Sequence, residues 1–215
     1  MNDRSFKSKY ATMPNDKPHS KREIATANRR RQILEAAVAC FVEQGYHQTG
    51  VREIAKRADI SLGNLYNHFA GKTDVLVEIA AIEREETAPY LAQLSKDGQA
   101  MDILEEFAVA YTKHLSDPVT QILSLEITSE AIRETEVANL FEESRAAMIT
   151  ALSSLLARGV REGSIRQIAD VTETAHLILD IVDSSAFRHG IESVELRKVL
   201  DNQVSFLRAA IAAHP

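Results

Sequence analysis

The chain has 215 residues, of which 45% are hydrophobic, and this content can bury the core of one large or two small domains. Its single cysteine excludes a disulfide within the chain. The sequence contains no apolar run long enough for a transmembrane helix, and its N-terminus lacks the apolar core of a signal peptide. We therefore expect a cytoplasmic protein. Its net charge of −6, taken alone, would argue against a nucleic-acid partner.

The charge is distributed unevenly along the chain. Residues 1–72 contain 13 Lys and Arg against 7 Asp and Glu, whereas residues 73–215 contain 12 against 24. Because phosphate binding requires local positive charge, we expect any contact with nucleic acid to be confined to the first third. Arg29, Arg30 and Arg31 lie in this third and form either a solvated charged turn or an arm that contacts phosphates.

The first predicted helix follows residues 1–19, which show no helical periodicity and are expected to form a flexible tail. Ser20 has capping-box spacing to Glu23, so the helix begins there or near Thr26. Gly45 suits the C-terminal cap. One apolar face runs along this helix, made of Ile33, Leu34, Ala37, Val38 and Phe41.

Two short helices joined by a tight turn are predicted next. The first has an apolar face with helical spacing, made of Val51, Ile54, Ala55 and Ala58. Asp59 can adopt the left-handed conformation of a turn, and Ser61 is a good N-cap for the second helix. Leu65 and Phe69 would face inward, which leaves a polar and aromatic outer side. Such a pair is typical of a helix-turn-helix, whose second helix lies in the major groove of DNA.

These segments resemble the DNA-binding domain of TetR/AcrR-type transcriptional regulators. The resemblance covers residues 29–77, through the stretches RRRQILEAAVACFVEQGY, REIAKRADIS and GNLYNHFAGKTDVL. It implies a three-helix N-terminal domain followed by a helical domain that binds a ligand and dimerises. The chain departs from the family at Gly50, usually Ser or Thr, at Asp59, usually Gly, and at Leu62, where Lys or Arg is common.

The resemblance also indicates DNA-contacting residues. Tyr66, His68 and Lys72 match positions that commonly contact phosphates, and each side chain can donate a hydrogen bond. Tyr66 could instead pack on the preceding helix, and Lys72 could be a solvated helix start. Asn64 and Asn67 could read base edges, and Gly63 permits either close approach to DNA or tight helix packing. The predicted DNA-binding set is Thr49, Arg52, Ser61, Gly63, Asn64, Tyr66, Asn67, His68 and Lys72.

Only helices are predicted in the rest of the chain, so the fold class is all-α. Their expected ranges are 72–95, interrupted or ended by Pro89, then 101–115, 118–132, 135–161, 171–189 and 193–212. We expect a tail over 1–19, a helix-turn-helix domain over 20–72 and an effector-binding, dimerisation domain over 73–215. The last two helices have apolar stripes that fit either an internal core or, as the resemblance implies, a four-helix bundle with a second subunit.

A small-molecule site needs a few polar groups in an apolar setting, and several polar residues interrupt the C-terminal helices. The candidates for contact with an effector are Tyr111, His114, Glu126, His176 and Asp180, although for any one of them a surface or dimer-interface position is the favoured interpretation. Glu173 and His176 have the spacing of one half of a di-iron motif, but no second copy exists. We therefore predict no cofactor and no metal.

The sequence contains no motif typical of a catalytic site. The function expected from it is a homodimeric, ligand-responsive regulator, a repressor that a small molecule releases from a palindromic operator. Activation would use the same DNA contacts. The alternatives are a helical small-molecule-binding or metal-dependent enzyme whose N-terminus imitates a DNA-binding fold, and an interaction protein that binds a different partner through its final helices.

Overall fold

The computed structural model describes residues 20–213, so the tail expected over 1–19 lies outside the described residues. Within the described range every regular element is a helix, apart from one isolated bridge between Ile165 and Ala212. The all-α fold class is therefore confirmed. None of these helices is long and apolar enough to cross a bilayer.

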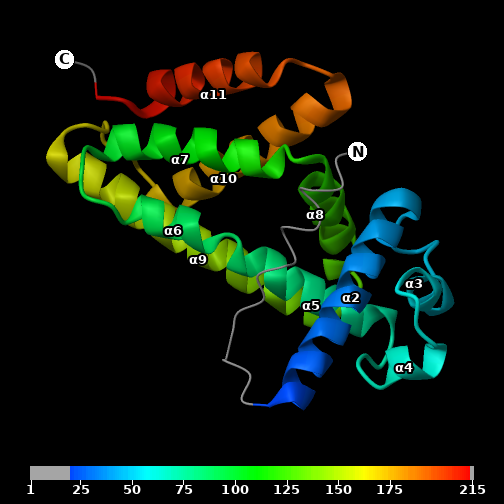
Figure 1. The fold of residues 1–215 in the computed structure, drawn as a ribbon. Helices are drawn as coiled ribbons and strands as arrows, with labels where there is room; N and C mark the ends of the chain where they lie inside the picture. Colours follow the sequence, from blue (N-terminus) through cyan, green and yellow to red (C-terminus); the bar gives the residue numbers. More distant parts are fainter. Residues whose placement is uncertain (1–19, 214–215) are drawn as a thin grey trace. The chain divides into compact units, whose positions relative to one another are not determined.

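The described residues divide into two compact units (Figure 1). Unit 1 comprises the described residues up to Glu83 together with Ile122–Leu140, and unit 2 comprises Arg84–Gln121 together with the described residues from Phe141 onward. The helices of unit 1 are α2 (Lys21–Gln44), α3 (Val51–Arg57), α4 (Leu62–Tyr66), α5 (Lys72–Glu85) and parts of α8 (Pro118–Ala131) and α9 (Thr135–Glu162).

Helix α2 begins at the earlier of its two predicted starts. The Ser20 hydroxyl accepts a hydrogen bond from the Glu23 amide at 3.2 Å, and the Glu23 carboxylate accepts from the Ser20 amide at 3.0 Å. The helix ends at Gly45, whose φ of 85° is unfavourable for other residues and whose amide donates to the Phe41 carbonyl. The predicted apolar face of α2 is buried.

The helix expected over residues 72–95 is in fact two helices, α5 and α6 (Ala88–Leu94). The buried Thr87 marks the break, where its hydroxyl donates to the Arg84 carbonyl at 2.7 Å. Pro89 lies in the first turn of α6, a position where proline needs no backbone hydrogen-bond donor. The break at Pro89 was therefore predicted correctly.

Unit 2 contains α6, α7 (Ala100–Leu115), α10 (Val171–Glu192), α11 (Leu196–Ile211) and the remaining parts of α8 and α9. Helix α7 packs against α10 and α11, and α11 runs alongside it in Figure 1. The core that they share with α9 includes the fully buried side chains of Leu104, Phe107, Leu152, Leu156 and Val182.

Helix α10 extends beyond its expected end at His189. Gly190 lies inside the helix, and a Cβ atom there would stand 2.0 Å from Gln121 Oε1, so glycine provides space for a close approach. The helix stops only at Ser193, which has a left-handed φ of 55°. The prediction of a break at His189-Gly190 was wrong because it took a packing glycine for a helix end.

Candidate functional site

The turn between α3 and α4 has the conformation expected from its residues. Asp59 adopts a positive φ of 51°, and the Ser61 hydroxyl caps α4 by accepting from the Asn64 amide at 3.1 Å. The inward residues Leu65 and Phe69 are 0% and 1% exposed. Since α4 has only five residues, this packing must supply the stability that so short a helix lacks on its own.

The outer side of α4 is open within its own unit. Tyr66 is 49% exposed, so packing on the preceding helix does not account for it, and Gly63 and Asn67 are exposed. A Cβ atom on Gly63 would meet no described atom within 4 Å, which removes tight packing within the chain as its explanation. Asn64 is half-buried, and its Oδ1 has no hydrogen-bond partner among the described residues.

His68 lies beside Arg30 of α2 just beyond α4. Arg30 Nη1 donates to the His68 carbonyl at 2.6 Å, its guanidinium forms an ion pair with Glu78, and it lies 4.3 Å above the Phe69 ring. Burial lowers the pKa of the His68 imidazole, and the positive charges of Arg30 and then Arg29 lower it further. Arg30 therefore holds the recognition segment in place, a role that neither sequence interpretation of the arginines included.

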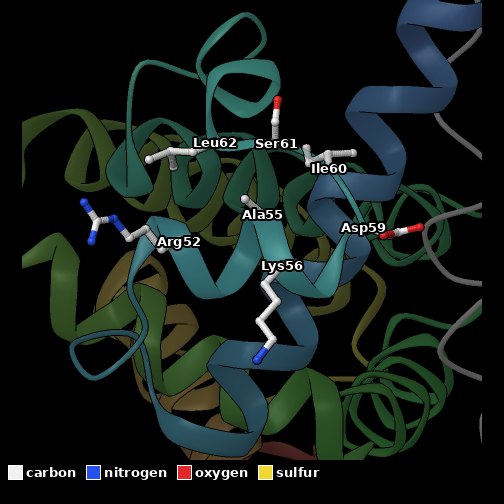
Figure 2. A pocket seen from close by; sticks show the side chains of 7 residues that line it. All are labelled: Arg52, Ala55, Lys56, Asp59, Ile60, Ser61 and Leu62. Atoms are coloured by element: carbon white, nitrogen blue, oxygen red, sulfur yellow. The ribbon is translucent and has the colours of Figure 1, made fainter.

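A surface hollow of about 610 Å³ lies between α3 and the start of α4 (Figure 2). Arg52 and Lys56 line it from α3, and Ser61 and Leu62 line it from the turn and α4. Arg52 and Lys56 form no ion pair with another described residue, so both charges are available to an anion. Lys56 is thus an exposed cation beside the start of α4, and the sequence interpretation did not include it among the candidate residues.

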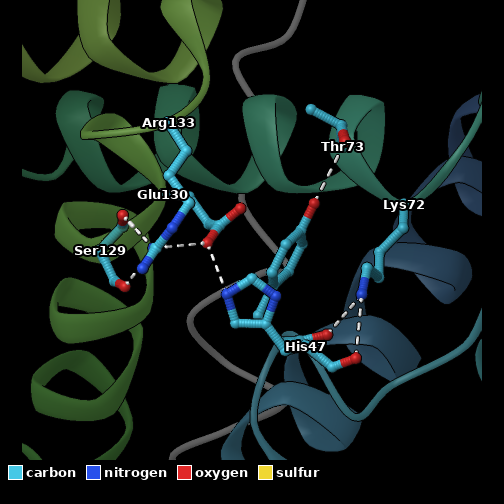
Figure 3. Close-up of polar contacts among 7 residues, drawn as sticks. His47, Lys72, Thr73, Ser129, Glu130 and Arg133 are labelled. Atoms are coloured by element: carbon cyan, nitrogen blue, oxygen red, sulfur yellow. Dashed lines mark hydrogen bonds and ion pairs between the residues drawn. The ribbon is translucent and has the colours of Figure 1, made fainter.

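Thr49 and Lys72 use their polar atoms inside unit 1. Thr49 is 2% exposed, and its hydroxyl donates to the Gly45 carbonyl at 2.8 Å. Lys72 Nζ donates to the Tyr46 carbonyl at 2.7 Å and lies 4.2 Å from the centre of the Tyr46 ring (Figure 3). Burial lowers the pKa of Lys72, opposed by the charges of Glu130 and Glu126. The Lys72 side chain at the start of α5 is therefore not freely solvated.

The five candidate effector residues are not gathered in one unit. Glu126 belongs to unit 1, whereas the other four belong to unit 2. Tyr111 and His114 lie in α7, where their rings stack 6.1 Å apart. The Tyr90 ring of α6 lies 5.0 Å from that of Tyr111 and 5.2 Å from that of His114, which makes a half-buried aromatic group.

The remaining two candidates, His176 and Asp180, lie on α10. Arg145 of α9, absent from the sequence predictions, pairs with Asp180 and donates to Asp183 Oδ2 at 3.2 Å. Burial raises the pKa of Asp183 to about 6, against the opposing charge of Arg145. Arg145 was missed because no local pattern connects it to acids 35 and 38 positions later in the chain. Within the part of the chain that the structure describes, no three His, Cys, Asp or Glu residues could hold a metal ion together.

Two family models match the chain. Residues 33–79 match bacterial regulatory proteins of the tetR family, and residues 102–209 match the C-terminal domain of the AefR-like transcriptional repressors. The second match alone covers half of the chain. The two together include the helix-turn-helix and most of the helices of unit 2, although α6 lies between the two matched ranges.

Individual proteins show the same similarity. The fatty acid metabolism regulator protein of Bacillus subtilis (strain 168) is 26% identical over 157 residues, which are 72% of this chain and 79% of that protein. The transcriptional regulator FadR from Bacillus subtilis, solved in complex with stearoyl-CoA, has a TM-score of 0.67 at 23% identity, covering 82% of this chain and 96% of that one. A transcriptional regulator from Saccharomonospora viridis, solved in complex with choline, has a TM-score of 0.75 at 19% identity, covering 87% and 100%. At these identities the two structures show a shared fold.

Proposed function

The chain belongs to the TetR family of bacterial transcriptional regulators, and we propose that it is a homodimeric repressor that a small molecule releases from a palindromic operator. As a member of this family it is a DNA-binding regulator and not an enzyme. In this proposal residues 20–72 bind the operator and residues 73–215 bind the effector and dimerise.

The exposed outer side of α4 is the observation that carries this proposal. A recognition helix must present its outer residues to the major groove, and Gly63 and Tyr66 on α4 and Asn67 at its C-cap are exposed. Tyr66 would donate to a phosphate, and the side-chain amide of Asn67 would reach a base edge. Asn64 would read a second base, for which its Oδ1 must turn outward from its buried position.

The remaining candidates have supporting parts in this proposal. Arg52 and Lys56 in the hollow beside α4 would bind the phosphates that flank the major groove. Ser61 and Thr49 would hold α4 and the start of α3 in shape, since their hydroxyls already bond to the backbone. Lys72 would reach a phosphate through its remaining N–H, because two of its three donors point to the Tyr46 and His47 carbonyls.

Exposed apolar side chains on the last two helices support dimerisation through α10 and α11. Leu177 on α10 is 53% exposed and Phe206 on α11 is 56% exposed, and large apolar groups of this kind are costly to leave in water. A two-fold dimer would place one α4 in each half-site of a palindrome, one helical turn of DNA or a multiple apart.

We propose a long-chain acyl-CoA as the effector. The support comes from relatives: a fatty acid metabolism regulator protein among the similar sequences and FadR bound to stearoyl-CoA among the similar folds. Binding of the effector in unit 2 would change the separation of the two α4 helices of the dimer. The two helices could then no longer bind both half-sites of the operator at the same time. Operator affinity would then fall.

A small quaternary ammonium compound is the second candidate effector. Cations of this kind bind over the faces of aromatic rings, and the half-buried group of Tyr90, Tyr111 and His114 offers such rings in unit 2. The regulator from Saccharomonospora viridis that shares this fold was solved with choline.

Selection of bound fragments from random DNA tests the proposal. We expect the purified protein to enrich a palindrome and to bind it at least about a thousandfold more tightly than random DNA at the same salt concentration. Sedimentation should show a dimer at micromolar concentration. Stearoyl-CoA should weaken operator binding while choline does not, and the reverse result would favour the second effector. Equal affinity for selected and random DNA would refute the regulator's proposed mode of action.

A further inference from the structure

The segment between α2 and α3, residues 45–50, sets where the helix-turn-helix begins. Tyr46 is 4% exposed, its ring lies edge-on to Phe41 at 5.3 Å, and its hydroxyl lies 3.2 Å from Thr73 Oγ1. Lys72 caps the Tyr46 carbonyl, and Thr49 bonds back to Gly45. His47 differs from Tyr46 and Thr49 because its side chain is 61% exposed. Its ring lies edge-on to that of Tyr46 at 5.5 Å, and its carbonyl lies 3.5 Å from Lys72 Nζ.

Two carboxylates of α8 face this segment within unit 1. Glu126 and Glu130 are four residues apart and so lie on the same side of the helix. Glu130 Oε1 lies 2.9 Å from His47 Nε2 and accepts from Arg133 Nη1 at 3.3 Å (Figure 3). Glu126 Oε1 would stand only 3.3 Å from a Cβ atom on Gly45, so α8 comes close to the segment at two points.

Burial makes the Glu130 contact energetically important. Glu130 is 3% exposed, and a carboxylate out of water must have its charge compensated by hydrogen bonds and opposite charges. Arg133 also donates to Ser129, so it belongs to the same end of α8. His47 is therefore the partner that connects this carboxylate to the segment preceding α3, and it lies three residues before the N-cap Gly50.

We propose that Glu130 is a positioning residue for operator binding, which acts through His47 to fix the start of α3 and with it the angle at which α4 meets DNA. The inference rests on the proposed function, since it concerns the same helix-turn-helix. Operator binding requires several phosphate and base contacts to form at the same time, whereas binding to random DNA depends on charge alone. Loss of this contact should therefore reduce operator affinity much more than affinity for random DNA.

A double-mutant cycle tests the pair. The variants are Glu130→Gln, His47→Ala, the two combined, and His47→Lys, which keeps a nitrogen donor for the Glu130 carboxylate. Glu173→Gln is the matched control, since it removes the same charge from the exposed first turn of α10. Affinity is measured on the selected operator and on random DNA of equal length, and thermal midpoints show whether each variant is folded.

We expect His47→Ala and Glu130→Gln each to lower the operator-to-random affinity ratio roughly tenfold, and the double variant to be no worse than either alone. His47→Lys should recover most of the ratio, and Glu173→Gln should leave it unchanged. Independent, additive losses would mean that His47 acts by itself on phosphate and would overturn the inference, as would an unchanged ratio in Glu130→Gln. If Glu130→Gln does not fold, additivity cannot be measured there, and failure of His47→Lys to recover the ratio lost in His47→Ala refutes the inference. Wild-type protein without operator preference would instead refute the proposed function.

Discussion

Replacing Asp183 with asparagine should stabilise the protein at neutral and alkaline pH. Burial raises the pKa of this carboxyl from 3.8 to about 6, although Arg145 Nη1 lies 3.2 Å from its Oδ2. The shift means that desolvation outweighs the attraction, so the ionised form is less favourable in the folded protein than in the unfolded chain. Asparagine keeps an acceptor for Arg145 and carries no charge.

The size of the effect follows from the shift of about two pKa units, which corresponds to about 3 kcal/mol in the free energy of unfolding before any correction. The Asp183 side chain is 34% exposed, so solvent screening reduces this to about 1 kcal/mol. For a chain of this length, such a gain raises the thermal midpoint by about 2–4 °C.

The pH dependence gives the prediction its sign. Because the folded pKa is raised, the favourable contribution of Asp183 is fully present below pH 3.8 and is lost as the pH rises through about 6. The difference between Asp183→Asn and wild type should therefore be absent near pH 3 and complete by about pH 7. Thermal unfolding at fixed protein concentration measures it, with Asp180→Asn, which removes the other carboxylate paired with Arg145, as the control. A lower midpoint for Asp183→Asn at pH 8 would show that the ion pair outweighs desolvation and would refute the reasoning.

Three further predictions concern DNA. Arg52→Ala and Lys56→Ala should each weaken binding to operator and to random DNA by the same factor. Each should also reduce the slope of log affinity against log salt by about 0.9 per half-site. A salt slope equal to that of wild type would exclude a phosphate contact. Asn64→Ala should lose about 1–3 kcal/mol of discrimination at one base pair, measured on operator variants, and equal losses on operator and random DNA would remove Asn64 from the base-reading set. The pKa of His68 is lowered in the free protein, and a nearby phosphate would raise it, so operator affinity should increase as the pH falls from about 7 to 5. That increase should be missing in His68→Gln, and an identical pH profile in the two proteins would contradict a phosphate contact by His68.

Local chemistry made much of unit 1 predictable from sequence. The predicted caps and turn depend on contacts within four residues along the chain. The structure shows them at Ser20 with Glu23, at Gly45, at Asp59 and at Ser61, as predicted. Helical spacing also identified the buried faces of α2 and α3, because one face of a helix repeats regularly in sequence.

Contacts between distant residues were not predictable in this way. Whether a residue that suits a DNA contact is free to make one depends on what folds against it, and Lys72 donates to the carbonyl of Tyr46, 26 residues earlier in the chain. Gly190 was taken for a helix end because its close neighbour, Gln121, comes from another helix. Long side chains such as Arg145 can reach partners on either side, so a single sequence does not indicate which one they meet.

The shortness of α4 explains why so much of the candidate site consists of supporting contacts. Five residues cannot form a stable helix in water, so the direction of α4 is determined by the residues at its two ends. Ser61 caps its start, and Phe69, under the Arg30 guanidinium, anchors the chain beyond its end. Arg30 in turn bonds to the His68 carbonyl and to Glu78 of α5, so a helix of unit 1 outside the helix-turn-helix also fixes α4. Replacement of Arg30 should therefore impair operator recognition although Arg30 itself need not contact DNA. The reasoning is the same as for Glu130, which acts at the start of α3.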